Sequence, residues 1–516
     1  MLRGPKHKTE TNVVYEPAPG TAQQFALNCP VDDLLICGSR GGGKSAVQLM
    51  NFRRLVGQGY GAFLSGVIFD REFKHLGDIV KQSKKFFYKF NDGAKFYASA
   101  SEYKWKWPTG EELLFRHAKN EEDYDSFHGH EYPWLGFNEL TKWPTAAFFD
   151  KIKSTNRSSF NPETDTPRCK KTGRYLTPDG QPLPPIPLRV VSTTNPSGAG
   201  RNWVKTRYID PAPYGTVLRS TAMVFDPKLQ EDRELSKTKI AIFSSYRDNP
   251  YLAAEYIAEL DGIKDENLRK AWLFGDWNAV GGGALDDLWG SHLYLPRFDI
   301  PPTWRVFRGF DWGSSHPFAV AWFAVSNGEE ATLPDGSTFC PPVGTIIQIN
   351  EWYGTEEIGT NKGLKMSAKN VALGIVAREE AMRDNGLISV QVEPGPADGQ
   401  IYQVREKDVD TIAKKMEAHG VYFRPADKSP GSRVNGLQVL REYMEATAEQ
   451  GDDPGLFFME PNCRATIATL PVLPRDDIKL DDVDTDAEDH MYDAVRYSVM
   501  YAAGGAARSI EIKHAT

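Results

Sequence analysis

Apolar runs that alternate with amphipathic stretches give the first half of the chain its pattern. The apolar runs have the length of buried strands, and the stretches between them repeat their apolar residues at helical spacing. Runs lie at 34–37, 62–69, 132–137 and 188–193, helical spacing lies at 46–52 and 71–90, and a hairpin is predicted from 103–107 to 113–116. Strands separated by helices predict a parallel, wound α/β sheet.

A second α/β pattern follows a break that is rich in glycine and proline. Strands are expected at 305–311, 317–325, 344–351 and 388–393, and helices at 364–383 and 487–503. Clusters of glycine and proline separate patterned regions, so the break predicts a domain boundary. The predicted organisation is a mobile polar arm (1–22), a first domain (23–280), a linker (281–302), a second domain (303–503) and a C-terminal tail (504–516).

A glycine-rich loop joins the run 34–37 to the helical stretch 46–52. It reads Gly38, Ser39, Arg40, Gly41, Gly42, Gly43, Lys44 and Ser45, the GxxxxGKS pattern of a P-loop. The glycines let backbone N–H groups wrap nucleotide phosphates, and the helix N-terminus adds a positive dipole end. We expect Lys44 to reach the β- and γ-phosphates of ATP and Ser45 to bind Mg²⁺. A glycine turn without function is the alternative, and it leaves the full spacing unexplained.

A glutamine pair just upstream of this loop is a candidate for base recognition. A glutamine in that place can read the adenine edge of ATP through paired hydrogen bonds, and Gln24 is the candidate. The alternative is an ordinary surface glutamine, and the sequence does not decide between the two.

Composition bounds the class of protein. Of 516 residues, 40% are hydrophobic and 12% aromatic, which is typical of a folded protein of two large domains or about three. Five scattered cysteines without a CxxC pair argue against a zinc module or a disulfide framework and favour a reducing compartment. No apolar run reaches the roughly 18 residues of a membrane span, and the N-terminus lacks a signal-peptide pattern. We therefore expect a soluble, intracellular protein without a membrane partner.

The net charge of −8 does not by itself indicate a nucleic-acid-binding protein. Much of the negative excess lies in one acidic run at 476–489, which we interpret as a solvated loop. A basic DNA-binding surface elsewhere on the protein is compatible with this run.

Aspartates at strand ends and on the last helix indicate a second chemistry. Asp311 ends the strand 305–311, and Asp398 follows the strand 388–393. Asp489 and Asp493 lie four residues apart on one helix face. Carboxylates that converge in this way are what a nuclease with two Mg²⁺ or Mn²⁺ ions needs to activate water and stabilise the leaving oxygen. An aspartate that closes a strand is more often a turn residue, so the prediction depends on the combination.

Together these motifs resemble the large terminase subunit of tailed bacteriophages, from about residue 23 to residue 501. The segments that carry the resemblance are 38–45, 129–141, 195–196, 308–313, 395–398 and 488–497. The family implies an N-terminal RecA-like P-loop ATPase of the additional-strand type and a C-terminal RNase H-like nuclease. It implies a motor that uses ATP hydrolysis to move double-stranded DNA into a prohead and an endonuclease that cuts concatemeric DNA.

The resemblance also implies partners and a location. The partners are double-stranded DNA, the portal protein of the prohead, the small terminase subunit and further copies of the chain in a ring. The location is the cytoplasm of the infected bacterium, with transient attachment to the prohead and absence from the mature virion.

Three positions of the ATPase half acquire roles from the resemblance. Glu139 matches the Walker B glutamate that aligns or activates the attacking water, and a strand-end carboxylate beside a P-loop faces the γ-phosphate. Arg40 matches an arginine that stabilises charge on the γ-phosphate, with a place on the protein surface as the alternative. Asn195, with Thr193 and Thr194, matches the segment that couples hydrolysis to movement, or else forms a helix-capping turn.

Asn138 departs from the family pattern, which has aspartate at this position to hold Mg²⁺ through a water. Asparagine keeps an acceptor but loses the negative charge, so the departure predicts weaker Mg²⁺ binding rather than an inactive site. Asn138→Asp is then expected to lower the Mg²⁺ concentration that ATP turnover requires.

In the nuclease half, Asp311 and Asp493 match the first and last metal ligands of the family. For the middle ligand Asp398 is preferred, Glu393 is the second choice and Glu351 the third. Asp489 is an extra ligand or a supporting residue, and His490 is expected to orient either carboxylate.

Three other functions compete with the packaging motor. A helicase or repair ATPase fused to a nuclease requires further helicase motifs and usually a second RecA-like domain. A structural, ATP-gated clamp with impaired hydrolysis would follow if Asn138 had removed turnover. An integrase or resolvase-type nuclease leaves the P-loop unexplained.

Overall fold

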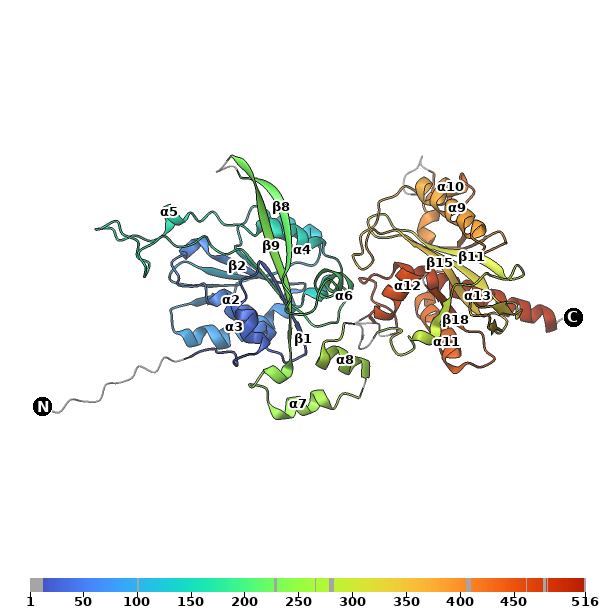
Figure 1. The fold of residues 1–516 in the computed structure, drawn as a ribbon, viewed down its shortest axis with the longest axis horizontal. Helices are drawn as coiled ribbons and strands as arrows, with labels where there is room; N and C mark the ends of the chain where they lie inside the picture. The colour runs from blue at the N-terminus through green and yellow to red at the C-terminus, as the bar shows by residue number, and fades with distance from the viewer. Residues whose placement is uncertain are drawn as a thin grey trace. The chain divides into compact units, whose positions relative to one another are not determined.

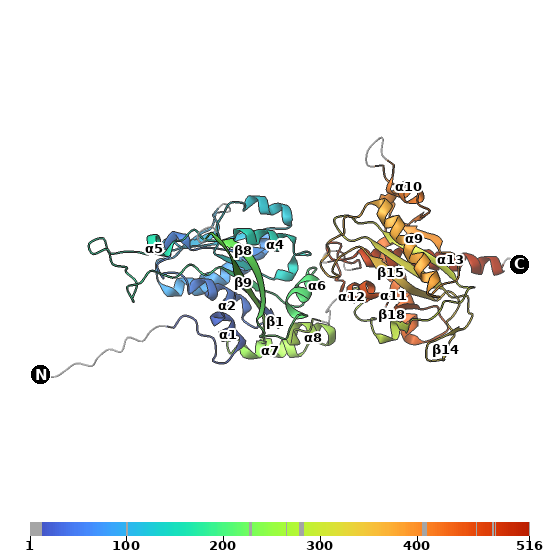
Figure 2. The ribbon, with the colours of Figure 1, turned by 45° about the horizontal axis from the view of Figure 1, so that its top comes forward.

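The computed structural model describes residues 13–99, 102–226, 230–264, 266–277, 283–404, 410–460, 462–476, 479 and 481–514, with side chains described except at 266–268 and 505–514. The chain divides into two compact units, Met1–Trp277 and Asn278–Thr516 (Figure 1; Figure 2). Residues 1–12 of the predicted arm and 281–282 of the predicted linker lie outside the described residues, as do 515–516 of the predicted tail.

The first unit is built on one nine-stranded sheet. Its strands are β1 (Asp33–Gly38), β2 (Ser65–Asp70), β3 (Lys95–Tyr97), β4 (Lys104–Lys106), β5 (Glu112–His117), β6 (Trp134–Phe137), β7 (Arg189–Thr193), β8 (Leu218–Asp226) and β9 (Glu231–Ser244). Its α-helices are α1 (Ala22–Asn28), α2 (Lys44–Arg53), α3 (Leu76–Phe87), α4 (Ala147–Ile152), α5 (Pro162–Asp165), α6 (Arg201–Val204), α7 (Ala254–Asp261) and α8 (Glu266–Phe274).

The order of these strands is β3-β4-β5-β2-β6-β7-β1-β9-β8. The six from β5 to β9 run parallel, and antiparallel pairs extend both edges. Strand β7 lies between β1, which leads into the glycine loop, and β6, which leads to Glu139. An extra strand between these two is the arrangement that defines the additional-strand type of P-loop ATPase. The predicted hairpin is confirmed as the pair β4 and β5.

Both faces of this sheet are covered, as the burial of β1 shows. Leu34 and Ile36 lie in one apolar core, and Leu35 and Cys37 lie in the other. A strand buried on both faces reads as a continuous apolar run, which is why the sequence pattern at 34–37 does not alternate. Figure 1 shows the hairpin of β8 and β9 extending beyond the rest of this sheet.

The second unit has its own seven-stranded sheet and a small two-stranded one. The strands are β10 (Tyr294–Pro296), β11 (Arg305–Asp311), β12 (Ala319–Val325), β13 (Ala331–Thr332), β14 (Thr338–Phe339), β15 (Ile346–Tyr353), β16 (Glu393–Ala397), β17 (Arg424–Pro425) and β18 (Leu456–Glu460). The α-helices are α9 (Ala368–Asp384), α10 (Ile412–Glu417), α11 (Ser432–Glu449), α12 (Arg464–Thr469) and α13 (His490–His514).

The strand order of the larger sheet is β10-β18-β15-β12-β11-β16-β17. Strands β11, β12 and β15 form an antiparallel meander, and β16 and β17 continue from β11 in parallel. Numbered by their order along the chain from β11, the five strands from β15 to β17 have the order 3-2-1-4-5, which is the topology of the RNase H-like fold. The predicted fold class, a RecA-like unit followed by an RNase H-like unit, is confirmed by the two sheets.

One predicted strand of this unit is wrong in its position. The sequence predicts a strand at 388–393, but β16 begins only at Glu393 and includes Pro394 and Pro396. Prolines cannot donate to a sheet ladder and argue against a strand from sequence alone. Pairing with β11 nevertheless holds this segment extended, and Gly395 lies so close to the Arg308 carbonyl that no side chain would fit there.

Two segments differ from the predicted division of the second half. Residues 294–296 fall within the predicted linker but form β10, which pairs with β18, and Leu293 is fully buried beside it. Apolar side chains between the glycines and prolines anchor this segment in the second unit. Helix α13 continues to His514, past the expected domain end at residue 503.

Candidate functional site

The glycine loop lies between β1 and α2, as a P-loop requires, and β9 fixes its shape. Ser244, the last residue of β9, accepts a hydrogen bond from Ser39 N (3.1 Å) and donates one from its hydroxyl to Gly42 O (2.6 Å). A Cβ at Gly42 would lie 2.5 Å from the Ser244 carbonyl oxygen, and one at Gly38 would also clash with it. The glycines are therefore needed for this close approach, and the loop keeps the cradle that phosphates would fill.

Three predicted residues from separate elements form one chain of hydrogen bonds. Lys44 Nζ donates to Ser39 O (2.7 Å) and to Asn195 Oδ1 (2.8 Å). Asn195 Nδ2 donates to both carboxylate oxygens of Glu139, at 3.3 and 3.2 Å. Burial lowers the pKa of Lys44, and the charge of Glu139 opposes that shift. Lys44 and Glu139 are thus joined through the side-chain amide of Asn195.

The backbone at Glu139 adopts a left-handed conformation that side chains rarely take, with φ 55° and ψ 69°. Thr193 Oγ1 accepts from Glu139 N (3.3 Å), and the hydroxyls of Thr141 and Thr194 contact each other at 2.8 Å. Strained residues persist where the surroundings determine them, and they cluster at functional sites. The segment 193–195 supplies those surroundings, so it is bonded directly to the turn that presents Glu139.

Arg40 and the upstream glutamines take places that the sequence did not decide. The Arg40 guanidinium stacks on the Trp272 ring, 3.2 Å from its centroid, and burial lowers the pKa of Arg40. Gln24 Oε1 accepts from Gly20 N, whereas Gln23 Nε2 donates to Gly42 O at 2.9 Å. The glutamine that contacts the glycine loop is therefore Gln23. The sequence of two adjacent glutamines does not show which of them is buried against the glycine loop.

Ser45 and Asn138 belong to two segments that the Gln48 side chain connects through hydrogen bonds. Ser45 is half-buried in the first turn of α2. From the same helix, Gln48 Nε2 donates to the carbonyls of Phe137 (2.9 Å) and Val191 (2.8 Å). Asn138 directly follows Phe137 in the chain, and its Nδ2 donates to Asp70 Oδ2 at 2.7 Å. A hydroxyl, an amide oxygen and a phosphate cradle are a donor set that fits a Mg²⁺–nucleotide complex.

In the second unit the predicted aspartates come together at one end of the sheet. Asp311 ends β11, and Asp398 N donates to Phe310 O (3.1 Å) on that neighbouring strand. Asp489 directly precedes α13 and Asp493 lies in its first turn, and His490 Nδ1 is 3.2 Å from Asp311 Oδ2. Helix α13 reaches β11 because Gly309 has no side chain, and a Cβ there would clash with Ser498 and crowd Ala494 O.

Burial and mutual repulsion shift the pKa values of these carboxylates. Burial, with repulsion from Asp493 and Asp398, raises the pKa of Asp311 well above its usual range. Burial, with repulsion from Asp493 and Asp311, raises the pKa of Asp489 to about 8. Such a group favours a positive charge between its members.

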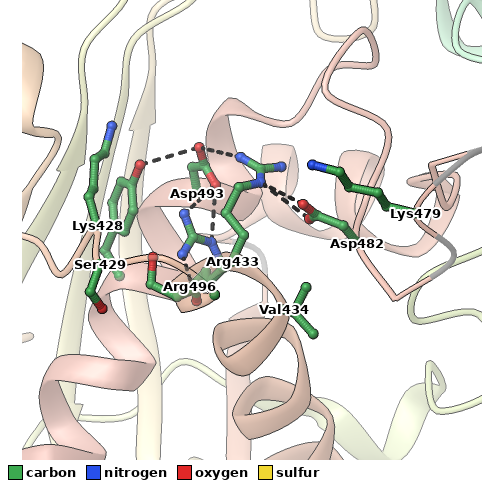
Figure 3. A pocket seen from close by; sticks show the side chains of 11 residues that line it. Lys428, Ser429, Arg433, Val434, Lys479, Asp482, Asp493 and Arg496 are labelled. Carbon is green, nitrogen blue, oxygen red and sulfur yellow. Dashed lines mark hydrogen bonds and ion pairs between the residues drawn. The ribbon is translucent and has the colours of Figure 1, made fainter.

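Basic side chains supply that charge in this structure (Figure 3). Arg496 Nη2 lies 2.9 Å from Asp493 Oδ1, and Lys428 Nζ lies 2.6 Å from Asp398 Oδ1. Arg433 extends between Asp482, at 3.1 Å, and Asp493, at 3.5 Å. These side chains border a cavity of about 380 Å³ that is lined by Lys428, Ser429, Gly431, Ser432, Arg433, Val434, Lys479, Asp482, Asp493, Arg496 and Tyr497.

These carboxylates are suitable ligands for a metal ion by their chemistry, but their side chains are not arranged around a metal position. Carboxylate oxygens are the ligands that Mg²⁺ and Mn²⁺ prefer. Within the described part of the chain, however, no three His, Cys, Asp or Glu side chains are arranged to hold a metal ion. The reason is visible at Asp398 and Asp493, whose oxygens contact lysine and arginine instead.

The two glutamates named as alternatives lie elsewhere. Glu393 is exposed at the start of β16 and pairs with Phe307, which lies four residues before Asp311 on β11. Glu351 accepts hydrogen bonds from Ala465 N, Thr466 N (3.0 Å) and Thr466 Oγ1 (2.8 Å), so it caps helix α12. Of the three middle candidates, the structure brings only Asp398 to Asp311.

Sequence reasoning missed Asp70, Lys428 and Arg433. Asp70 is the last residue of β2, and Glu139 comes just after β6. The reasoning that selected Glu139 as a carboxylate at a strand end could therefore have selected Asp70 as well. Lys428 and Arg433 carried no signal, because nothing in their local sequence indicates that they contact aspartates 30 and 49 residues away.

Among the described residues, no helix has the length and apolar character to cross a membrane. Residues 35–274 match the family model of the phage terminase large subunit. No curated protein sequence matches the chain.

Three solved structures show how remote the structural relatives are. The HK97 bacteriophage large terminase is 12% identical with a TM-score of 0.41, over 92% of this chain and 92% of that chain. The large terminase of a thermophilic bacteriophage, in complex with ADP, is 12% identical with a TM-score of 0.36, over 93% and 98%. The P22 large terminase nuclease domain is 15% identical with a TM-score of 0.29, over 42% and 91%. The resemblance predicted from the motifs is confirmed: over residues 35–274 the chain matches the phage terminase large subunit family.

Proposed function

We propose that the protein is an ATP-driven motor that moves double-stranded DNA into a prohead, with a metal-dependent endonuclease in its second unit. The observation that carries the proposal is the chain from Lys44 through Asn195 to Glu139 in a P-loop of the terminase family. It joins the lysine that would bind phosphate to the carboxylate that would act on water.

The contacts of Lys44 suggest how phosphate binding is transmitted. One of its two partners is the Asn195 side chain, at 2.8 Å. A phosphate that attracts Lys44 Nζ competes with this contact and thereby changes the hydrogen bonds from Asn195 to Glu139. Glu139 then orients the attacking water and accepts its proton. Ser45 and Asn138 would hold Mg²⁺, which supplies neutralisation of phosphate charge when it is bound.

In the second unit, Asp311, Asp398, Asp489 and Asp493 are the residues that would hold Mg²⁺ or Mn²⁺. Bound ions would supply activation of water for phosphodiester hydrolysis. His490 orients Asp311 through the 3.2 Å contact. Lys428 and Arg433 would have to release Asp398 and Asp493 before these carboxylate oxygens could act as metal ligands.

The proposed partners follow from the same function. They are double-stranded DNA, the portal protein of a prohead, the small terminase subunit and neighbouring copies of the chain in a ring. The place of action is the cytoplasm of an infected bacterium and, during packaging, the prohead.

Plasmid cleavage tests whether the two sites act separately. Wild type, Lys44→Ala and Asp311→Ala are incubated with supercoiled plasmid and Mg²⁺ or Mn²⁺, and ATP turnover is measured in parallel. We expect Asp311→Ala to abolish cutting and keep ATP turnover, and Lys44→Ala to do the reverse. Undiminished cutting by Asp311→Ala would mean that the nuclease site is elsewhere.

A further inference from the structure

A buried carboxylate lies beside the position where the family has its Walker B aspartate. Asp70 ends β2, the parallel neighbour of β6, and Asn138 N bonds to Phe69 O at 2.9 Å. The Asp70 side chain is 0% exposed, and its Oδ2 accepts from Asn138 Nδ2 at 2.7 Å. The carboxylate absent at position 138 is thus present one strand away.

Asp70 is held in place from several sides. Lys142 Nζ lies 3.0 Å from both of its carboxylate oxygens, and Glu72 N donates to Oδ1 at 3.3 Å. His75 Nδ1 is 3.7 Å from Oδ1. A buried charge persists only where it is paired and hydrogen-bonded, and Asp70 meets that condition. Because Lys142 follows Glu139 in the same turn, the pair also ties β2 to the segment that presents the glutamate.

The contact with Asp70 orients the Asn138 amide. A carboxylate only accepts hydrogen bonds, so the NH₂ group must face Asp70 and Oδ1 must face away. Because Nδ2 is used by Asp70, Oδ1 is the acceptor end that the Asn138 side chain can offer to another group. Donation to a carboxylate also polarises the amide and increases the negative charge on Oδ1. Asn138 is therefore a fixed acceptor at the end of β6.

We propose that Asp70 is a positioning residue of the ATPase site, which supplies from β2 the carboxylate that position 138 lacks and fixes Asn138 Oδ1 toward the Mg²⁺–nucleotide. The inference rests on the proposed ATPase function. It changes the expectation for Asn138→Asp, because that single substitution places two carboxylates at hydrogen-bond distance, where they repel.

A reciprocal exchange tests the pair. The proteins are wild type, Asp70→Asn, Asn138→Asp, the double variant Asp70→Asn/Asn138→Asp, and Asp78→Asn as a control at an exposed aspartate. Thermal unfolding in EDTA reports folding of each protein. Calorimetric titration with ADP, once with Mg²⁺ and once with EDTA, gives the gain in ADP affinity that Mg²⁺ provides.

We expect Asp70→Asn to reduce this Mg²⁺-dependent gain by about tenfold, the effect typical of a residue that orients a metal ligand, and to leave ADP affinity in EDTA unchanged. Asn138→Asp should lower the unfolding temperature. The double variant should restore both quantities, because it rebuilds an amide–carboxylate pair in the opposite direction.

Two results would overturn the proposal. One is an equal loss of ADP affinity with Mg²⁺ and with EDTA in Asp70→Asn, which indicates a structural role alone. The other is a double variant no better than Asn138→Asp. If Asn138→Asp does not fold, the comparison of Asp70→Asn with wild type still decides. A wild type whose ADP affinity does not depend on Mg²⁺ would instead contradict the proposed ATPase function itself.

Discussion

Glu139 combines a strained backbone with a side chain that two other residues hold in place. Its φ of 55° is maintained by the contacts of its backbone N–H with Thr193 and of its carboxylate with Asn195. A residue in this conformation costs of order 1–3 kcal/mol, which the surrounding bonds must offset. The geometry suits a carboxylate that has to stay in one place for a water molecule.

Glu139→Gln should reduce ATP turnover by about 10²- to 10⁴-fold, because the amide cannot accept the proton of the attacking water. The side chain keeps its size and an acceptor for Asn195, so ADP affinity should stay near that of wild type. Turnover assays and ADP titration measure the two quantities, with Glu122→Gln as the exposed control. A turnover that is unchanged in Glu139→Gln would exclude Glu139 as the base.

The pKa of Asp489 predicts a pH dependence of stability in the metal-free protein. Burial and repulsion from Asp493 raise this pKa to about 8, whereas an unfolded aspartate titrates near about 3.9. Between these values the folded protein holds a proton that the unfolded chain releases, so the free energy of unfolding falls as pH rises through this window. Unfolding temperatures in EDTA from pH 5 to 8.5 should decline more in wild type than in Asp489→Asn. Equal slopes would contradict the assignment.

At the scale of elements, the P-loop depends on how closely β9 approaches it. The Ser244 carbonyl oxygen lies only 2.5 Å from the position that a Cβ on Gly42 would take. A side chain at this position must displace either the loop or the end of β9. The P-loop is thus shaped by a strand some 200 residues away, not by its own sequence alone.

Gly42→Ala should therefore lower ADP affinity strongly while the protein stays folded. Gly77→Ala is the matched control, since a Cβ at Gly77 in α3 meets no atom within 4 Å. That control should leave ADP affinity unchanged and be neutral or stabilising by up to about 1 kcal/mol, because alanine favours a helix. Titration with ADP and thermal unfolding distinguish the two variants. Wild-type affinity in Gly42→Ala would show that the loop can move away from Ser244.

At the scale of the whole molecule, the two units differ in architecture. The first has a central parallel sheet with an extra strand between β1 and β6, and the second has an RNase H-like sheet. A helicase built from two RecA-like domains would show two sheets of the first kind. The described residues show one, which favours a packaging motor with a nuclease over a helicase.

A motor that grips the DNA backbone should bind double-stranded DNA with a steep dependence on salt. If it contacts six to ten phosphates, its affinity should fall by about 10³- to 10⁵-fold between 50 and 200 mM salt, with little sequence preference. Fluorescence anisotropy with two unrelated duplexes measures both quantities. The protein has a net charge of −8, so overall electrostatic attraction between protein and DNA cannot produce a steep salt dependence. The result is therefore informative. An affinity that is insensitive to salt would count against backbone gripping.

The sequence by itself determined the P-loop, the α/β class of both units and most of the strands. It could do so because these features are local: the GxxxxGKS spacing, the run 34–37 and the strand ending at Asp311 each carry their signal within a few residues. Glu139 and Asn195 were also identified from sequence, but only through the resemblance to a family.

Only the tertiary structure decided which side chains meet. Strand β16 forms despite two prolines because β11 pairs with it, and this pairing places Asp398 rather than Glu393 beside Asp311. Asp70 reaches Asn138 across 68 residues of sequence, and Arg433 reaches Asp493 across 60. Such contacts follow from strand order and helix packing, which depend on the whole chain, so no local pattern could predict them.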